Sequence, residues 1–297
     1  MTVILDDPSL RLVEHYRDDP HLRGALNALT RQTYGFDFEA WYQAGFWPDD
    51  HQPCSLVRQG QMLANASSNR LDFSLDGQHL RTVQIGTVMT APEAQGNGYS
   101  RYLMERLVSR WAERCDLLYL FANGTVLELY PKFGFRRVLE HEHYLPWSAS
   151  PRASSFKPVD LDDNDQRRHF MATVASSCPQ ARLSLQPHVS QTMFYCQGPY
   201  REALHYSTTH DAYVVVEHEQ GQMLLAEVYC ARPVVLLALI GELVRDTTRE
   251  VVLGFTPLQA DGFATRVVDN DDALFVWGST ATALDAQPLM FPRLSHT

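Results

Sequence analysis

The sequence predicts an α/β fold with a mixed α+β sheet, arranged as two domains. The stretch GTVMTAPEAQGNGYSRYLMERL, Gly86 to Leu107, runs a β-branched strand through a proline and a loop with two glycines into an amphipathic helix. An apolar run without alternation follows from Leu117 to Ala122, as expected of a strand covered on both faces. The second half repeats the order strand, helix, strand. With 297 residues, 45% of them hydrophobic and 20% charged, the chain can form two packed cores.

The first domain is expected over residues 1–147. In its central helix Leu103, Leu107 and Trp111 recur every four residues, which gives the helix one apolar face to pack on a sheet. The expected elements are a helix over residues 21–35, strands over 61–73 and 79–90, a helix from about 99 to 113, and strands over 117–122 and 136–147.

A linker is expected over residues 148–165, because SASPRASSFKPVDLDDND is rich in Ser, Pro and Asp and breaks both periodicities. A second α/β domain then covers residues 166–297. Its clearest elements are strands over 222–230 and 250–255 and a helix over 233–246, with Pro233 in the first turn. Since no glycine lies between Tyr229 and Pro233, no second cofactor site is expected there.

Composition limits the partners of this chain. A formal net charge of −10 disfavours nucleic acid and anionic membrane surfaces, and a cationic substrate fits it better. The five scattered cysteines show no metal-ligand spacing, so neither a disulfide framework nor a zinc site is expected. We also find neither a signal-like start nor a run of ~20 apolar residues, and we expect a cytoplasmic protein that does not enter a membrane.

The loop before the central helix suits a phosphate group. Gly96 and Gly98 let backbone amides approach a ligand closely, and the helix start offers unpaired N–H groups and a positive dipole end. A P-loop is excluded because Gly98 is followed by Tyr99 and Ser100 without a lysine. A dinucleotide fingerprint would need a third glycine where Arg101 stands. A glycine-rich turn without a ligand is the alternative.

Two motifs resemble the GNAT superfamily of N-acetyltransferases. QGNGYS, starting at Gln95, is similar to the family's Q/R-x-x-G-x-G/A motif, with Ser100 in place of the last Gly or Ala. NGTVLELYPKFGF, starting at Asn123, is similar to its Asn-x(6)-Tyr-x(3)-Gly-Phe signature. The resemblance covers Gly86 to Val138 and extends to uncharacterised bacterial members of the family. By element order alone, the second half resembles a degenerate GNAT domain that has lost its cofactor site. An unrelated α/β domain is the other interpretation.

The resemblance implies a site for acetyl-CoA as co-substrate and no metal. Strand residues would pair with the pantetheine arm, the glycine loop would hold the pyrophosphate, and a side chain at the end of the next strand would bond the arm. Asn123 also fits a plain Asn-Gly turn. The residues that match these positions are Val88, Met89, Thr90, Gln95, Gly96, Asn97, Gly98, Tyr99, Ser100, Arg101 and Asn123.

The resemblance also places Tyr130 at the family's general-acid position. A phenol with a pKa near ~10 is protonated at neutral pH and can donate to a departing thiolate. Pro131 disfavours the α region for Tyr130, so the direction of its hydroxyl is not fixed by the sequence. Gln84 lies on the strand where many relatives carry a glutamate base, and an amide cannot take a proton. The general base stays open.

Acceptor contacts are expected from the aromatic and acidic stretch YGFDFEAWYQAGFWPDDHQP, through cation–π contact and charge pairing. Core packing of those aromatics is the competing interpretation. We take Asp37, Trp41, Trp47 and Gln84 as the substrate-site candidates. His51 is interpreted as a solvated loop residue. His141 and His143 share a strand face, a two-ligand arrangement without identifiable partners, so no metal site is expected.

The function these patterns favour is transfer of an acetyl group from acetyl-CoA to a primary amine, by direct attack in a ternary complex. The acceptor would be a small cationic molecule or a peptide amine, and further copies of the chain could join it in a homo-oligomer. A noncatalytic acyl-CoA sensor or scaffold is the alternative, favoured by Gln84, Ser100 and Pro131.

Overall fold

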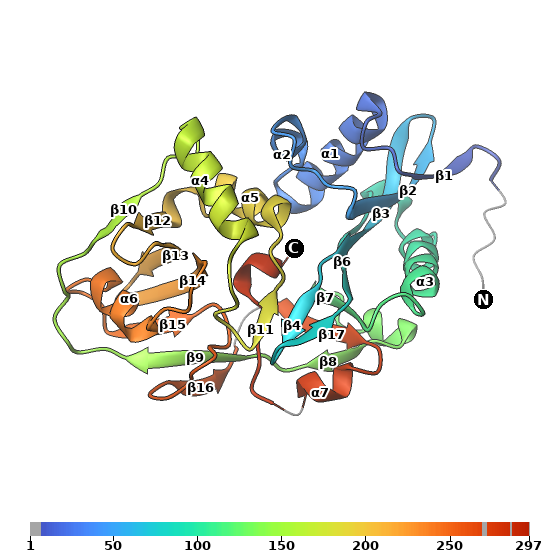
Figure 1. Cartoon of the computed structure of the whole chain (residues 1–297). Coiled ribbons are helices and arrows are strands. Elements are labelled where there is room, and N and C mark those ends of the chain that lie inside the picture. The colour runs from blue at the N-terminus through green and yellow to red at the C-terminus, as the bar shows by residue number, and fades with distance from the viewer. Residues whose placement is uncertain (1–6, 269–271, 286, 297) are drawn as a thin grey trace.

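The computed structural model describes residues 7–268, 272–285 and 287–296 and contains two large mixed sheets, a small one and flanking helices (Figure 1). Within these ranges the first sheet has the strand order β1-β2-β3-β6-β7-β17-β8, and the second has the order β10-β12-β13-β14-β15-β9-β16. A third sheet, β11-β4-β5, joins strands from both halves of the chain. No helix in the described ranges has the length and apolarity that a bilayer crossing needs.

The strands of the first sheet are β1 (Leu10–Glu14), β2 (His51–Arg58), β3 (Gln61–Arg70), β6 (Thr82–Thr90), β7 (Leu117–Asn123), β17 (Asp272–Trp277) and β8 (Arg136–Val138). Those of the second are β10 (Phe156–Pro158), β12 (Leu204–Ser207), β13 (Ala212–Glu219), β14 (Gln222–Cys230), β15 (Glu250–Leu253), β9 (His141–Pro146) and β16 (Ala264–Val267). Those of the third are β11 (Leu183–Leu185), β4 (Phe73–Leu75) and β5 (Gln78–Leu80).

The α-helices are α1 (Pro20–Tyr34), α2 (Glu39–Gln43), α3 (Tyr99–Trp111), α4 (Asn164–Ala175), α5 (Val189–Gln197), α6 (Leu236–Leu243) and α7 (Ala281–Asp285). Short 3₁₀ helices are η1 (Pro92–Ala94), η2 (Tyr130–Phe133), η3 (Arg201–Ala203) and η4 (Arg293–Ser295).

Strand β7 is buried on both faces, which confirms the interpretation of its unbroken apolar run. Leu118 and Leu120 point into a core shared with α1 and α3. Leu117 and Tyr119 point into a second core on the other face of the sheet, and Phe291 from the C-terminal segment stacks on Tyr119 with ring centroids 4.5 Å apart. The far end of the chain therefore covers the second face of the first sheet.

The two large sheets exchange strands across the expected boundary at residue 147. Strand β9, from the first half, lies between β15 and β16 of the second sheet. Strand β17, from the second half, lies between β7 and β8 of the first sheet. The stretch expected as a linker, residues 148–165, contains β10 and the start of α4.

The second half confirms the predicted order of strand, helix and strand, since β14 and β15 pair in parallel with α6 between them. The helix is shorter than expected and spans Leu236–Leu243 instead of residues 233–246. Pro233 is therefore not in its first turn, and Val235 at the N-cap is extended (φ −81°, ψ 101°). At the other end Val244 returns to an extended conformation (ψ 155°).

Candidate active site

A cleft opens where β6 and β7 stop pairing. The two strands pair in parallel only from Thr82 with Leu117 to Gln84 with Tyr119. Beyond this point β6 continues beside β3, and β7 continues beside β17. The space between them is a cavity of about 970 Å³, which we call the β6–β7 cleft. Both strands line it with backbone groups that have no partner strand on that side.

Helix α3 begins at the outer end of this cleft without a side-chain cap. Its N-cap is Gly98, in the left-handed region at φ 78°, and Gly96 has φ 79°. By contrast, Asp19 caps α1 by accepting from the backbone N–H of His21 at 2.9 Å, and Asp163 caps α4 in the same way. An uncapped helix start leaves N–H donors and the positive dipole end for an anion. The residues present thus fit a pyrophosphate.

A β-bulge lies in the part of β6 that lines the cleft. The register between β3 and β6 shifts between Asn65 and Ser67, and Thr87 opposite has a left-handed φ of 45°. Asn65 Nδ2 donates to the Thr87 carbonyl (2.9 Å), and Thr87 Oγ1 donates to Ser67 Oγ (2.7 Å). Strain of this kind persists only where the surroundings hold it. Asn65 and Ser67 were not among the residues predicted from the sequence, although four of the five residues from 65 to 69 are polar within a buried strand, which was a signal.

Most of the expected cofactor residues line the β6–β7 cleft: Val88, Met89, Thr90, Gln95, Gly96, Gly98, Tyr99, Ser100, Arg101 and Asn123. Asn97 is not among the lining residues, and its Nδ2 donates to the carbonyl of Ala94 at 3.0 Å. The unusual Ser100 shares a hydrogen bond of 2.5 Å with the Thr90 hydroxyl. Asn123 accepts from the backbone N–H of Thr125 at 3.1 Å and so also forms the turn that its sequence allows.

Tyr130 lies on the wall of the same cleft, at the start of η2, and is 5% exposed. Burial raises the pKa of its hydroxyl above 10, and the neighbouring Tyr34 raises the pKa further. Tyr34 donates to the carbonyl of Val88 at 2.9 Å. Pro131 occupies the first turn of η2, a position that proline tolerates.

A second cavity of about 420 Å³ adjoins the cleft, and we call it the aromatic cavity. Phe36, Gly86, Thr87 and His296 line both spaces, which therefore meet at the bulge. The other walls come from the segment around α2 and from α5 of the second half. Contacts between α5 and the first half could not be foreseen, because no local pattern marks them.

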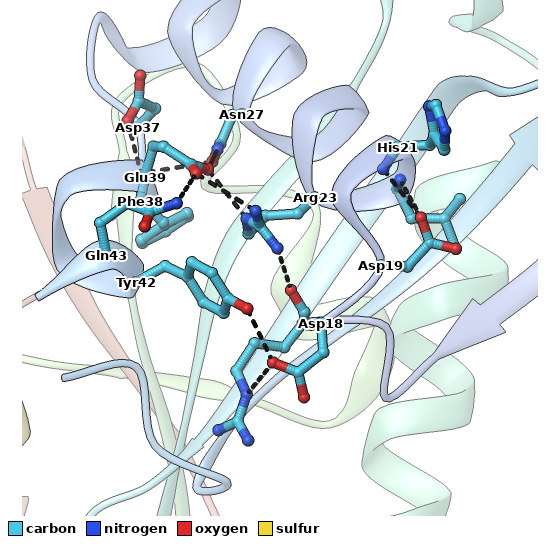
Figure 2. A network of polar contacts seen from close by, with 12 residues as sticks. Asp18, Asp19, His21, Arg23, Asn27, Asp37, Phe38, Glu39, Tyr42 and Gln43 are labelled. Atoms are coloured by element: carbon cyan, nitrogen blue, oxygen red, sulfur yellow. Dashed lines mark hydrogen bonds and ion pairs between the residues drawn. The ribbon is translucent and has the colours of Figure 1, made fainter. Parts of the chain in front are cut away.

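The wall around α2 is held by a polar network (Figure 2). Glu39 accepts from Arg23 Nε at 3.0 Å, from Asn27 Nδ2 at 2.8 Å and from Gln43 Nε2 at 2.8 Å. Asn27 Oδ1 in turn accepts from the backbone N–H of Phe38 at 3.2 Å. These bonds tie the segment that follows α1 to the helix itself and fix the aromatic side chains it carries.

The four substrate-site candidates separate into two groups. Asp37 and Trp41 line the aromatic cavity, and Trp41 Nε1 donates to the carbonyl of Ser190 on α5 at 2.9 Å. Trp47 stacks behind Trp41 with ring centroids 5.9 Å apart and lines neither space. Gln84 is fully buried and also lines neither.

His51 corrects our interpretation of a solvated loop residue. It begins strand β2, is 6% exposed, and lines the aromatic cavity among the rings of Phe38, Trp41 and Trp47. Burial lowers the pKa of His51 to about 4, so the ring is neutral at pH 7. The nearby proline suggested a loop, whereas strand β2 begins at His51 and includes Pro53.

A chain of amide groups fixes the tautomer of His51. A backbone carbonyl only accepts, so Gln84 must donate through Nε2 to Ser295 O (2.9 Å). Gln84 Oε1 then accepts from Asn69 Nδ2 (3.4 Å), and Asn69 Oδ1 accepts from His51 Nδ1 (2.6 Å). The proton of the imidazole is thus on Nδ1, and Nε2 carries a lone pair. Within the described residues Nε2 has no hydrogen-bond partner.

No group of three or more His, Cys, Asp or Glu side chains in the described ranges is placed to hold a metal ion. His141 and His143 lie on β9, in the second sheet. Their strand is therefore not part of the sheet that forms the cleft.

Comparison with known proteins finds a protein family whose model matches part of this chain. A family model described as an acetyltransferase (GNAT) domain matches residues 24–138. A search of curated proteins finds no match.

Solved structures share the fold over most of the chain. A conserved protein of unknown function from Enterococcus faecalis, described as a probable N-acyltransferase, is 13% identical with a TM-score of 0.58 over 90% of this chain and 72% of its own. A GCN5-related N-acetyltransferase from Kribbella flavida is 17% identical (TM-score 0.55; 90% and 70% covered). Eis1 from Mycobacterium abscessus is 14% identical (TM-score 0.55; 89% and 72% covered).

At these identities the solved structures support the fold alone, and the family model supplies the assignment of the domain. The parting of β6 and β7, the uncapped start of α3 and the bulge all lie within the matched range. Residues 24–138 match the acetyltransferase (GNAT) domain model, and the chain shares its fold with the GCN5-related N-acetyltransferase and the probable N-acyltransferase named above.

Proposed function

We propose that this protein transfers an acetyl group from acetyl-CoA to a primary amine, by direct attack within a ternary complex. The observation that carries the proposal is the junction of the two spaces at Gly86 and Thr87. The β6–β7 cleft leads from an uncapped helix start to the bulge, and the aromatic cavity reaches the same bulge from the other side. Acetyl-CoA in the cleft and an amine in the aromatic cavity could therefore be bound at the same time and come into contact at the bulge.

The chain's own groups supply the steps around the reacting atoms. Acetyl-CoA would bring the activated acetyl group as a thioester. A backbone N–H near Val88 or Met89, two residues that line the cleft, would donate to the developing oxyanion. The hydroxyl of Tyr130 is held protonated by burial and can give its proton to the departing thiolate.

The reaction balances without an oxidant or a reductant. A bond forms between the amine nitrogen and the acetyl carbon, and the bond between that carbon and sulfur breaks. The nitrogen loses one proton and the thiol gains one. This proton transfer and acyl transfer require no metal ion.

A first experiment tests acetyl-CoA binding. Gly98→Val places a β-branched side chain at a left-handed position, and calorimetry should show that CoA affinity is lost. Gly98→Asn keeps the left-handed conformation and adds only a short polar side chain, so it separates backbone strain from occupation of the site. Unchanged CoA affinity in a folded Gly98→Val variant would falsify the assignment of the loop.

A second experiment tests turnover. An assay for free thiol in the presence of acetyl-CoA and a panel of primary amines should show release that depends on the amine. CoA binding without amine-dependent release from any member of a broad panel would favour an acyl-CoA sensor instead.

A further inference from the structure

Few of the described residues line both the β6–β7 cleft and the aromatic cavity. They are Phe36, Gly86, Thr87 and His296. Phenyl, hydrogen and hydroxyl side chains do not take up a proton near neutral pH, whereas an imidazole does. Within this shared set, His296 is therefore the one candidate for a proton acceptor at the point where acetyl-CoA and the amine would come into contact.

The contacts of His296 fix its tautomer and its orientation. Nε2 lies 3.1 Å from the carbonyl oxygen of Phe291. A carbonyl only accepts hydrogen bonds, so Nε2 carries the proton and the lone pair of the neutral ring is on Nδ1. Phe121 stacks on the same ring with centroids 3.9 Å apart. The hydrogen bond and the stacked ring together hold the imidazole in one position.

The lone pair on Nδ1 is open to a ligand. Nδ1 forms no hydrogen bond within the described ranges, and it is not one of the enclosed polar atoms that lack a partner there. It therefore keeps accessible surface, in a side chain that is 18% exposed. Because His296 lines both spaces, we place this surface at their junction. His51 differs, since its unpaired Nε2 is fully enclosed and cannot reach a ligand.

The imidazole of His296 is neutral before the amine binds. Burial, together with the positive charge of Arg293, lowers the pKa of His296 to about 3. At pH 7 Nδ1 is therefore unprotonated and can accept a hydrogen bond from a neutral amine. The lone pair of that amine stays available for the acetyl carbon. Once the new bond has formed, the amine nitrogen no longer holds its lone pair and becomes a much stronger acid.

A buried carboxyl group lies behind the imidazole and can stabilise its protonated form. Oε1 of Glu140 lies 4.0 Å from Nε2 of His296 and accepts from the backbone N–H of Phe291 at 2.8 Å. Burial raises the pKa of Glu140 to about 7, so this carboxyl titrates around neutral pH. A carboxylate within ~4–6 Å of an imidazole favours the imidazolium. A proton taken up at Nδ1 would thus be held beside a negative charge.

From these observations we infer that His296 receives the attacking amine: Nδ1 accepts a hydrogen bond from its N–H and takes that proton as the bond from nitrogen to the acetyl carbon forms. Tyr130, which lines the same cleft, gives the proton that leaves with the thiol. Afterwards the imidazolium returns its proton to solvent and Tyr130 regains one, so both side chains are restored. The inference rests on the proposed function and assigns its general base.

Two substitutions remove the lone pair of Nδ1, and each keeps a different contact of the ring. His296→Phe keeps the stacking on Phe121, and His296→Gln keeps an N–H that can donate to Phe291. Neither side chain takes up a proton. In both variants kcat should fall ~100- to 10,000-fold, the usual contribution of a general base, while CoA affinity stays unchanged. His205→Phe is the control, because its ring also donates to a backbone carbonyl, that of Ala203 at 3.0 Å, but lines neither space.

Release of free thiol from acetyl-CoA measures turnover, after subtraction of the rate without enzyme. Hydroxylamine and 2-phenylethylamine are the two amines. Hydroxylamine is largely unprotonated at pH 7 and small enough to reach the junction whatever body the natural acceptor has, and 2-phenylethylamine adds a ring for the aromatic cavity. Calorimetry with CoA and thermal unfolding by circular dichroism show that each variant is folded. NMR of the histidine ring nitrogens should show His296 neutral at pH 7 with its proton on Nε2.

The outcomes separate this inference from the proposed function. Losses of kcat in both variants, with CoA affinity and His205→Phe at the wild-type level, support it. Wild-type turnover that persists in folded His296→Phe and His296→Gln overturns it and leaves the acetyltransferase intact. A loss confined to one variant traces the effect to the contact which that variant breaks, and a proton on Nδ1 at pH 7 leaves no acceptor, so either result also overturns it. If the wild type releases no thiol with any amine of the panel, the proposed function fails and the inference falls with it.

Discussion

The hydroxyl of Tyr130 is the group that distinguishes catalysis from binding alone in this site. Tyr130→Phe keeps the buried ring and removes only the proton donor, so CoA affinity should survive. General acids typically contribute ~100- to 10,000-fold, and kcat should fall within that range. The lower end is expected, because a thiol with a pKa of about 8.5 on the cysteine scale can depart without assistance.

Steady-state kinetics with calorimetry of CoA binding measures both quantities for Tyr130→Phe, and Tyr200→Phe in the second half serves as the control. A folded Tyr130→Phe variant that turns over its amine at the wild-type rate would show that the ring is ordinary packing. Since burial raises the pKa of Tyr130 above 10, this hydroxyl should not itself produce a loss of activity between pH 6 and about 9.

His51 should make stability depend on pH. Burial lowers its pKa to about 4 in the folded chain, whereas an unfolded histidine titrates near ~6.5. Between these values the unfolded state binds more protons, so the free energy of unfolding falls as the pH is lowered from about 6.5 to 4. The full loss from this one group is on the order of 3 kcal/mol.

Denaturant unfolding at several pH values tests this expectation. His51→Phe removes the titrating group and keeps a ring among the aromatic neighbours, so the free energy of unfolding should depend less steeply on pH than in the wild type. The slope is the readout, and a uniform change in stability does not affect it. His21→Ala, at an exposed position on α1, is the control. Equal slopes for wild type and His51→Phe would contradict the low pKa.

At the level of elements, the two strand–helix–strand units differ in what fills their clefts. Strands β14 and β15 pair in parallel from Gln222 to Leu225 and then part, as β6 and β7 do. Here the segment Cys178–Arg182 lies between them. The N–H of Cys178 donates to the carbonyl of Cys230 (2.9 Å), and the N–H of Arg182 donates to that of Thr256 (2.9 Å). The backbone groups that a pantetheine arm would use are thus already paired.

The start of α6 has no side-chain cap, like that of α3, but no glycine lies between Tyr229 and Pro233 before it. Gln180 Oε1 lies 3.5 Å from the backbone nitrogen of Val234, just before the helix. A calorimetric titration should therefore give one CoA per chain, and Gly98→Val should remove all binding rather than half. A stoichiometry of two, or residual binding of one CoA in Gly98→Val, would show that the second cleft can open.

Local patterns predicted the elements of the first cleft well. The four-residue spacing of Leu103, Leu107 and Trp111 placed α3, and the paired glycines placed its start, because both features are properties of consecutive residues. The predicted extent of α6, residues 233–246, was wrong. Propensity alone does not show where tertiary contacts end a helix. Gln191, Tyr195 and His296 could not be predicted as cavity residues, because their position depends on contacts with distant parts of the chain.

For the whole molecule, the exchange of β9 and β17 means that each large sheet needs a strand from the other half of the chain. β17 separates β7 from β8, and its Phe275 and Val276 are buried on opposite faces of the first sheet. The segment around Phe291 covers the same sheet. The order of strands along the chain does not reveal such an exchange, because β9 directly follows β8 in sequence yet belongs to the other sheet.

The exchange leads to a prediction for the isolated first half. A fragment of residues 1–147 lacks β17 and the C-terminal cover, so β7 would become an edge strand with Leu117 and Tyr119 exposed on one face. Exposed apolar edges of this kind favour aggregation over a stable monomer. We expect this fragment to show no cooperative thermal unfolding by circular dichroism and no CoA binding. Mixing it with residues 148–297 during refolding should restore both properties, since the second fragment carries β17. A 1–147 fragment that unfolds cooperatively and binds CoA by itself would show that the first domain is complete without the exchanged strand.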